Sequence, residues 1–242
     1  MHHVQLKLLP LNEYSGVDEN DPIKFYNIPI IGKMYRRRIE LCLEELIGGE
    51  KILEIGFGSG VSFLNLNDTY KEIYGLDLTA DVNLVQKKFT EKNIRLNLEN
   101  GNILSLPYPD NYFDSVLLIS ILEHLKTSDQ DQAFKEIKRV LKPGGQVVYG
   151  VPIERPFMVM MFHMLGTDIR SYHFSTENDV CAAASRHLIP INIKKMTGPM
   201  GLFGDVYEIG HFEKKGNRIV SKNCEIFFGG NSKIILPDPN SR

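Results

Sequence analysis

Apolar residues follow two alternating patterns along most of the chain: short continuous runs, and a spacing of three or four residues. A short run indicates a buried strand, and the wider spacing indicates one face of a helix. Because the patterns alternate, the sequence predicts a parallel α/β sheet with helices on both faces. The predicted strands are 51–55, 72–76, 94–98, 113–119, 146–151, 189–196 and 205–212, and the predicted helices are 34–47, 81–92, 128–141 and 176–187.

Local signals place the ends of three of these helices. The glycine pair at 48–49 ends the first one, since glycine commonly follows a helix C-terminus. Ser128 with Asp131 and Thr176 with Asp179 have the spacing of capping boxes, in which a hydroxyl and an acid satisfy exposed backbone N–H groups. These pairs predict that two helices begin just after Ser128 and Thr176.

The chain length of 242 residues is ordinary for a single α/β domain. Prolines interrupt any periodic pattern over residues 1–33, which we expect to form an irregular N-terminal extension. The domain itself is expected over 34–215. The tail at 216–242 contains a glycine pair at 229–230 that is typical of a hairpin turn.

Composition and charge exclude several classes of protein. Hydrophobic residues make up 43% and charged residues 24%, as in globular domains. A net charge of −2 and a pI near 6.4 lack the basic character of nucleic-acid-binding domains, so no nucleic acid is expected as a partner. The basic triplet 36–38 is typical of a solvated helix face, with binding of an anion or of anionic lipid as the alternative.

Cysteine usage and hydropathy favour a cytoplasmic protein. Cys42, Cys181 and Cys224 lie far apart, without metal-binding spacing, and are typical of reduced intracellular thiols. The N-terminus lacks an apolar run with a cleavage site, and no stretch approaches the roughly 18 apolar residues needed to cross a bilayer. We therefore expect a soluble protein of the cytoplasm.

A glycine-rich turn at Gly56-Phe57-Gly58-Ser59-Gly60 follows the first predicted strand. Glycine lets a backbone leave a strand sharply and approach a ligand with no Cβ in the way. The spacing GxGxG differs from the GxGxxG of pyrophosphate-binding sites. Asp77 closes the next strand, where a carboxylate can accept hydrogen bonds from both hydroxyls of a ribose. The alternative is an aspartate that caps the following helix. Together, the loop and the acid favour a nucleoside site.

Four blocks of sequence extend this pattern: 52–60, 74–77, 101–125 and 137–145. In this order they resemble the class I S-adenosylmethionine-dependent methyltransferases, particularly the type 11 group that includes ubiquinone and menaquinone biosynthetic enzymes. The resemblance covers roughly residues 34–196. It implies a Rossmann-like three-layer α/β sandwich, with a seven-stranded mixed sheet whose last strand is antiparallel. It also implies S-adenosyl-L-methionine as cofactor and S-adenosyl-L-homocysteine as product.

The resemblance assigns roles to residues along the predicted cofactor site. Glu54 and the loop glycines would hold the methionine part, Asp77 the ribose, and Asn102 the adenine amino group. The family usually has aspartate at position 102, but the asparagine carbonyl oxygen can also accept that hydrogen bond. Ile103 would pack on the adenine ring, and Ser120 would lie at the reacting end of the cofactor. The full predicted set is Glu54, Gly56, Phe57, Gly58, Gly60, Asp77, Leu78, Asn102, Ile103 and Ser120.

The catalytic residues are harder to predict, because a sulfonium methyl group is already activated and the protein mainly positions the acceptor. His124 is the candidate general base for an acceptor that must lose a proton. In some quinone O-methyltransferases a Glu-His pair binds magnesium together with an acid three residues before it. Here that position is Ser120, so Glu123 and His124 are expected to shape the loop, and no metal is predicted.

The family inserts substrate-binding elements after the fifth strand, which implies a lid here over about 152–174. Four methionines and three phenylalanines lie within 155–174, and methionine adapts to irregular apolar partners. One interpretation is an apolar lid over a lipid-like or aromatic acceptor, with a membrane surface as a further possible contact; the other is an amphipathic helix packed on the core. The candidate substrate residues are Met161, His163, Tyr172 and His173.

The function predicted from the resemblance is methylation of a small apolar or aromatic molecule on oxygen or carbon. The motif (Asp/Asn)-Pro-Pro-(Tyr/Phe) of enzymes that methylate nucleobase or amide nitrogens is absent after the fourth predicted strand. A non-catalytic cofactor-binding module with a protein partner is the main alternative. A nicotinamide-dependent oxidoreductase is disfavoured by the GxGxG spacing. The acceptor's identity and the oligomeric state stay open.

Overall fold

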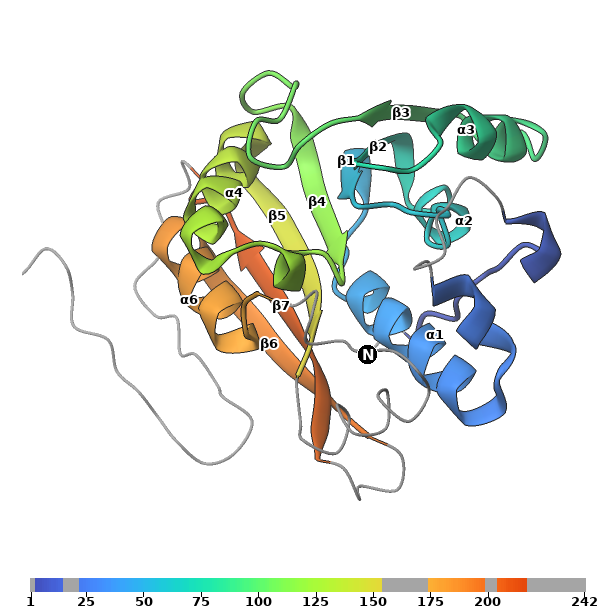
Figure 1. The fold of residues 1–242 in the computed structure, drawn as a ribbon. Coiled ribbons are helices and arrows are strands. Elements are labelled where there is room, and N and C mark those ends of the chain that lie inside the picture. Colours follow the sequence, from blue (N-terminus) through green and yellow to red (C-terminus); the bar gives the residue numbers. More distant parts are fainter. Residues whose placement is uncertain (1–2, 15–21, 154–173, 199–203, 217–242) are drawn as a thin grey trace, which may run out of the picture.

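The computed structural model describes residues 3–14, 22–153, 174–198 and 204–216 (Figure 1). Its helices are α1 (Pro29–Glu44), α2 (Phe63–Leu66), α3 (Val82–Thr90), α4 (Thr127–Val140) and α6 (Glu177–His187), with short 3-10 helices at Leu11–Glu13, Pro22–Asn27 and Leu122–His124. Its strands are β1 (Gly49–Ile55), β2 (Tyr70–Asp77), β3 (Leu96–Asn100), β4 (Phe113–Ile119), β5 (Leu141–Pro152), β6 (Ile189–Thr197) and β7 (Asp205–Glu213).

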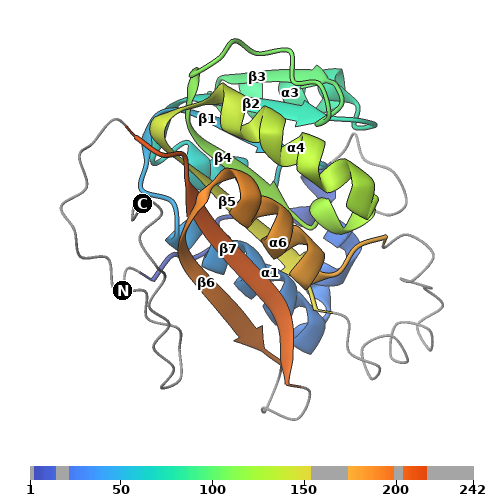
Figure 2. The same cartoon turned by 90° about the vertical axis from the view of Figure 1, so that its left-hand side faces the viewer.

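The strands form one seven-stranded sheet in the order β3-β2-β1-β4-β5-β7-β6. Neighbours from β3 to β5 pair in parallel, whereas β7 lies antiparallel between β5 and β6 (Figure 2). The predicted Rossmann-like mixed sheet with an antiparallel last strand is therefore confirmed. The strand order reverses between β1 and β4, and ligands bind at this switch point in open α/β sheets.

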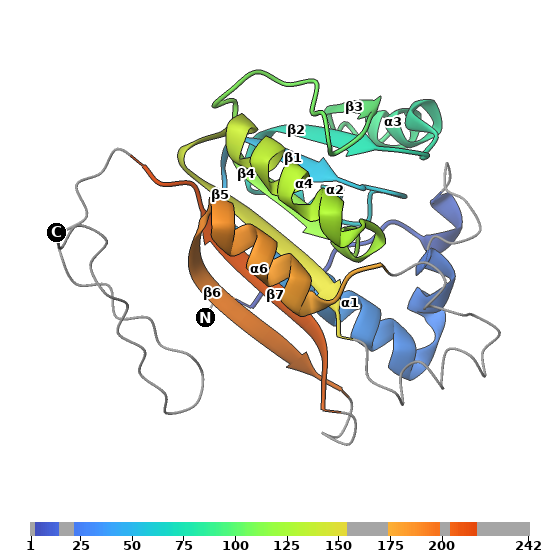
Figure 3. The same cartoon turned by 60° about the vertical axis from the view of Figure 1, so that its left-hand side comes forward.

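Helices cover both faces of the sheet, which makes three layers. Figure 3 shows α4 and α6 side by side on one face, with α1 on the other. Side chains of β4 alternate between the faces: Val116 and Leu118 pack with the cluster that includes α4 and α6, and Leu117 packs with the cluster that includes α1 and α3. All three are fully buried, as expected for a central parallel strand.

The N-terminal region is more regular than the sequence predicts. Helix α1 begins at Pro29, five residues before the predicted start at Met34, and two 3-10 helices precede it. Proline suits the first turn of a helix, because its fixed φ is helical and its missing N–H has no partner there. The expectation that Pro29 interrupts regular structure is therefore wrong.

One of the two predicted capping boxes is wrong. Helix α4 begins at Thr127 after Lys126, without a side-chain cap, and the Ser128 hydroxyl donates to Asp129 instead. Asp131 accepts from Arg186 and His187 of α6, so its carboxylate joins two helices. The box of Thr176 and Asp179 is confirmed, with both of its hydrogen bonds present.

Several strand boundaries also differ from the prediction, and β1 and β2 each begin two residues early. Strand β3 spans 96–100, two residues later than expected. Strand β5 begins at Leu141, directly after α4, so residues 142–145 belong to the strand rather than to a turn. The pairing of β4 with β5 shifts register between Phe113 and Ser115, which accommodates the extra residues before Gln146. The predicted tail hairpin and most of the predicted lid lie outside the described residues.

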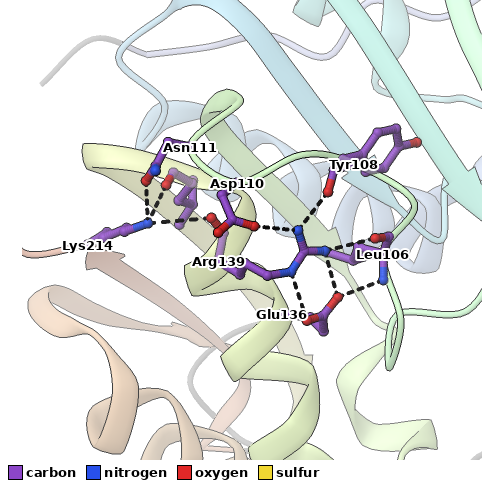
Figure 4. Close-up of polar contacts among 8 residues, drawn as sticks. Leu106, Tyr108, Asp110, Asn111, Glu136, Arg139 and Lys214 are labelled. Atoms are coloured by element: carbon purple, nitrogen blue, oxygen red, sulfur yellow. Dashed lines mark hydrogen bonds and ion pairs between the residues drawn. The ribbon is translucent and has the colours of Figure 1, made fainter.

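A network around Arg139 fixes the loop that joins β3 to β4 (Figure 4). The Arg139 guanidinium donates to the carbonyl oxygens of Leu106 and Tyr108, at 2.8 and 2.7 Å, and to the carboxylates of Asp110 and Glu136. Glu136 in turn accepts from the backbone N–H of Leu106 at 2.9 Å. Because Arg139 and Glu136 lie on α4, this helix positions the loop.

None of the helices in the described part of the chain has the length and hydropathy of a membrane-spanning segment.

Candidate cofactor-binding site

The glycine loop leaves β1 with three glycines in the left-handed region of backbone space. Gly56, Gly58 and Gly60 have φ values of +73°, +50° and +76°. A Cβ added at Gly56 would lie 2.1 Å from Cδ1 of Ile121, and one at Gly60 would lie 2.5 Å from the Phe63 ring. The loop therefore requires glycine for its conformation and also for its close packing.

Asp77, at the end of β2, hydrogen bonds to this loop. Its Oδ2 accepts the backbone N–H of Gly58 at 2.9 Å, and its Oδ1 accepts the N–H groups of Thr79 and Ala80, each at 2.9 Å. Asp81 is the residue that caps α3, through the N–H of Leu84. Asp77 is thus not the N-cap, and its half-buried carboxylate lies at the edge where a ribose is predicted.

Glu54 is a buried carboxyl group at the same end of β1, with 3% of its surface exposed. The Ser62 hydroxyl donates to its Oε2. Burial raises the pKa of Glu54 to about 8, and the charge of nearby Asp77 contributes in the same direction, although the bond from Ser62 lowers it. The side chain that is predicted to face the cofactor's ammonium group is therefore protonated more readily than an ordinary glutamate.

The predicted adenine side lies on the loop after β3. The exposed Asn102 uses Oδ1 to accept the N–H of Leu104 at 2.9 Å, which leaves one of that oxygen's two lone pairs for an adenine amine. Ile103 is 6% exposed and packs in the core cluster of α4 and α6. The loop backbone is closed by the N–H of Gly101, which donates to the carbonyl oxygen of Asp77 at 3.0 Å.

Ser120 follows β4 with a φ of +57°, an uncommon conformation for a residue with a side chain. Its backbone N–H donates to the carbonyl oxygen of Gly150, and its hydroxyl lies 2.9 Å from the hydroxyl of Tyr207 on β7. Its neighbour Ile121 contacts Gly56, so Ser120 lies beside the glycine loop. The structure thus brings together the ends of β1, β2 and β4 at one edge.

Comparisons with known proteins agree with this geometry. The family described as "Methyltransferase domain" matches residues 53–149. Demethylmenaquinone methyltransferase of Bacillus licheniformis is 36% identical over 103 residues, which are 41% of this chain and 44% of that protein. The ubiquinone/menaquinone biosynthesis C-methyltransferase UbiE of Vibrio cholerae is 29% identical over 154 residues, 54% of this chain and 57% of that protein. The matches thus span about half of each relative.

Residues 53–149 of the chain therefore match a methyltransferase domain, and the relatives that the chain resembles are named as methyltransferases. The crystal structure of geranyl diphosphate C-methyltransferase from Streptomyces coelicolor A3(2) has the same fold, with a TM-score of 0.63 at 14% identity over 88% of this chain and 91% of that one. S-adenosylmethionine is the cofactor of this family, and solved neighbours contain it or its demethylated product. The half-buried carboxylate of Asp77 at the edge of the glycine loop fits the hydroxyls of such a nucleoside.

Two predicted cofactor residues of this methyltransferase lie differently from the others. The Phe57 ring is 3% exposed, packs near the ring of Phe63 and fills the space over Gly75, so a ligand would meet only its backbone. Leu78 is 70% exposed directly after Asp77, where it is free to cover a bound nucleoside. Both assignments stay predictions, as do the roles of the other eight residues.

The catalytic and metal candidates lie beyond Ser120. Glu123 is buried and His124 is exposed, within the short 3-10 helix Leu122–His124. Among the residues that the structure describes, no group of three or more His, Cys, Asp or Glu side chains is placed to hold a metal ion. The predicted substrate residues Met161, His163, Tyr172 and His173 lie outside the described residues.

Sequence reasoning missed three residues of this methyltransferase that the fold brings to the site. Ser62 contacts Glu54, and Tyr207 contacts Ser120 from a strand 87 positions away in sequence. Arg38 lies beside Tyr207, with its guanidinium carbon 5.8 Å from the ring centroid. The basic triplet 36–38 was a visible signal for Arg38, but the sequence alone does not indicate which of the three arginines faces inward.

Proposed function

We propose that this chain transfers the methyl group of S-adenosylmethionine to a small apolar or aromatic acceptor, on oxygen or carbon. The observation that carries the proposal is the hydrogen bond from Gly58 to Asp77, which joins the glycine loop to the acid at the switch point of the sheet. S-adenosylmethionine would supply an activated methyl group. The protein's own part is to bind the cofactor, orient the acceptor and exclude water.

The order of strands sets the order in which the proposed site would bind the cofactor. The loop after β3 carries Asn102 for adenine, β2 ends at Asp77 for ribose, and β1 ends at Glu54 and the glycine loop for the methionine part. Ser120 follows β4, on the far side of β1 from the adenine position. The acceptor would therefore lie beyond Ser120, toward β5 and β7.

The apolar character of the acceptor is supported by the relatives and by exposed side chains. The names of two relatives concern menaquinone or ubiquinone synthesis, and one fold neighbour methylates geranyl diphosphate; each of these compounds has an apolar part. In this chain Phe174 is 57% exposed, and its backbone N–H donates to the carbonyl oxygen of Glu123 next to the site. An apolar acceptor could pack against it.

Two measurements test the proposal. Calorimetric titration with S-adenosylhomocysteine should show saturable binding to the wild-type chain and weaker binding to Asp77→Ala. Methyl-labelled S-adenosylmethionine should then label a member of a panel of quinols, phenols and prenylated acids. An absence of cofactor binding at millimolar concentration would overturn the proposal. Binding without labelling of any acceptor would instead support the alternative of a non-catalytic module.

The role of His124 is tested with the labelled acceptor. If His124 removes a proton from an oxygen acceptor, His124→Asn should lower kcat about 10²- to 10⁴-fold, the range for a general base, and leave cofactor affinity unchanged. The neighbouring Lys126→Met, which changes an exposed charge two residues along the chain, should have no effect. An unchanged kcat in His124→Asn would remove this residue from the chemistry and favour an acceptor that needs no base.

A further inference from the structure

Arg38 is a half-buried cation on α1 whose buried Nε finds no hydrogen-bond acceptor among the residues that the structure describes. Within the described part of the chain it donates no hydrogen bond and makes no ion pair, and its Nε is completely buried. Its guanidinium carbon lies 4.0 Å from the ring centroid of Tyr35 and 5.8 Å from that of Tyr207. The rings and the charge of nearby Glu123 stabilise the cation, but no hydrogen bond from its five N–H donors reaches an acceptor in the described part of the chain.

The other members of the basic triplet are in a different situation. Arg37 forms an ion pair with Glu44 at 2.8 Å and lies near Glu40 at 3.6 Å. Arg36 lies over the Tyr26 ring at 5.8 Å. Neither has a buried donor atom that lacks a partner, among the residues described. The interpretation of the triplet as a solvated helix face therefore fits Arg37. The buried Nε of Arg38 needs another explanation.

Leaving such a group unsatisfied is costly. A buried donor without an acceptor costs on the order of 1–3 kcal/mol, and more when the group is charged. Such groups are few in native proteins, and a bound ligand or ion is one of the explanations for them. A planar guanidinium is also the side chain best suited to bind a carboxylate or phosphate with two parallel hydrogen bonds.

The position of Arg38 identifies the side of the site that it serves. Tyr207, which lies next to Arg38, is on β7 and its hydroxyl contacts that of Ser120. Along the sheet, β7 lies beyond β4 and β5, away from the adenine, ribose and methionine positions at β3, β2 and β1. Arg38 therefore lies past the reacting end of the cofactor, where the acceptor is expected.

We propose that Arg38 binds an anionic oxygen group, a carboxylate or a phosphate, of the methyl acceptor. This inference rests on the proposed function and narrows it from any apolar or aromatic molecule to one with an acidic group. The Tyr35 ring would pack against the part of the acceptor next to its acidic group, while the buried Tyr207 ring lies behind the guanidinium. The guanidinium would orient the acceptor relative to Ser120, so Arg38 is a binding residue and takes no part in proton transfer.

The test uses the full chain saturated with S-adenosylhomocysteine, with benzoate and inorganic phosphate as anionic probes. Benzyl alcohol is the neutral control, and sodium chloride keeps the ionic strength constant. At least one of the two anions should raise the Tm of the wild-type protein, and benzyl alcohol should not. Arg38→Met should abolish this anion-dependent shift. Arg37→Met removes the same charge from the same helix and should retain it.

A second readout separates binding from a structural role. Arg38→Met keeps the aliphatic stem and removes an unsatisfied buried donor, so the Tm of the ligand-free protein should stay equal or rise. A lower Tm together with an unchanged anion response would overturn the inference, because Arg38 would then only support the fold. An absent anion response in the wild-type protein would also overturn it.

Binding of two cofactor analogues shows whether Arg38 binds an anionic group of the acceptor or the carboxylate of the cofactor. S-adenosylhomocysteine has a carboxylate, and 5′-methylthioadenosine lacks it. If Arg38 serves the acceptor, Arg38→Met should change the Kd of both compounds less than twofold. A tenfold loss for S-adenosylhomocysteine alone would assign Arg38 to the cofactor and overturn the inference. A wild-type chain that binds neither compound would contradict the proposed function itself, so the two failures are distinguishable.

Discussion

The backbone N–H of Gly58 donates to Oδ2 of Asp77 across 2.9 Å, although the two residues are 19 positions apart. Oδ1 of the same carboxylate accepts the N–H groups of Thr79 and Ala80, so Asp77 joins the glycine loop to the turn that follows β2. A carboxylate offers about four acceptor sites, and three are in use. A ribose would therefore bind to an acid that is already held in place, and would compete for part of its hydrogen-bonding capacity.

The first prediction concerns Asp77. Asp77→Ala should weaken binding of S-adenosylhomocysteine by about 1–3 kcal/mol, because a charged hydrogen-bond acceptor is lost. It should also lower the free energy of unfolding, since three backbone N–H groups lose their acceptor. Asp81→Ala is the matched control: it removes the cap of α3, should cost about 1 kcal/mol of stability, and should leave the affinity unchanged. Equal affinities for wild type and Asp77→Ala, measured by calorimetry, would place the ribose elsewhere.

The second prediction separates contact from backbone strain in the glycine loop. Gly56→Ala should lower the free energy of unfolding by about 3 kcal/mol, since φ is +73° and the new Cβ would lie 2.1 Å from Ile121. Gly144→Ala has a similar φ of +79°, but its new Cβ would meet nothing closer than 4.0 Å. It should cost only about 1 kcal/mol.

Chemical denaturation of both variants checks this difference. Adding Ile121→Ala to Gly56→Ala should recover part of the loss, because the double variant removes the clash and keeps the strain. Equal losses in Gly56→Ala and Gly144→Ala would show that packing against Ile121 is unimportant.

The third prediction follows from the raised pKa of Glu54. Its pKa of about 8 in the folded chain is above the ordinary value of 4.5, so between these pH values the folded protein holds a proton that the unfolded chain releases. The contribution of Glu54 to the free energy of unfolding is therefore highest below pH 4.5 and falls as the pH rises toward 8. Glu54→Gln should reduce this slope, measured by denaturation across pH 5–8.5.

The same group should make cofactor affinity depend on pH. The ammonium group of the cofactor favours an ionised Glu54, so the affinity for S-adenosylhomocysteine should increase as the pH rises from 6.5 to 8.5. Glu54→Gln cannot ionise and should bind with an affinity that is nearly constant over this range. A wild-type affinity that falls with pH would contradict the assignment of Glu54 to the ammonium group.

The fourth prediction concerns Arg139, which holds the loop with Asn102 and Ile103 onto α4 (Figure 4). Arg139→Met should lower the free energy of unfolding by about 2 kcal/mol, because two backbone carbonyls and Glu136 lose a charged donor. It should also weaken cofactor binding through the adenine side. Lys138→Met changes an exposed neighbour on the same helix and should alter neither quantity. Arg139→Lys should not restore stability, since one ammonium group cannot replace the planar guanidinium and its five N–H donors.

Much of the fold could be predicted from local pattern. All seven strands and four of the five described α-helices follow from apolar runs and helical spacing, because those periods report which side chains are buried. Helix α2, four residues long, is too short to leave a periodic signal. The start of α1 at Pro29 was predictable from the preference of proline for the first turn of a helix. The capping box at Ser128 failed because Asp131 forms a tertiary contact with α6 instead.

The same distinction between local sequence and tertiary structure applies to the candidate site. The sequence by itself determined the glycine loop, the acid after the second strand and the family blocks, since these depend on residue type and on spacing within one supersecondary unit. Only the tertiary structure decided that Gly58 binds Asp77, that Ile121 packs against Gly56, and that Arg38 faces Tyr207. Each of these contacts joins segments that are distant in sequence, and their distance and burial are set by how the sheet orders its strands and how α1 packs on it.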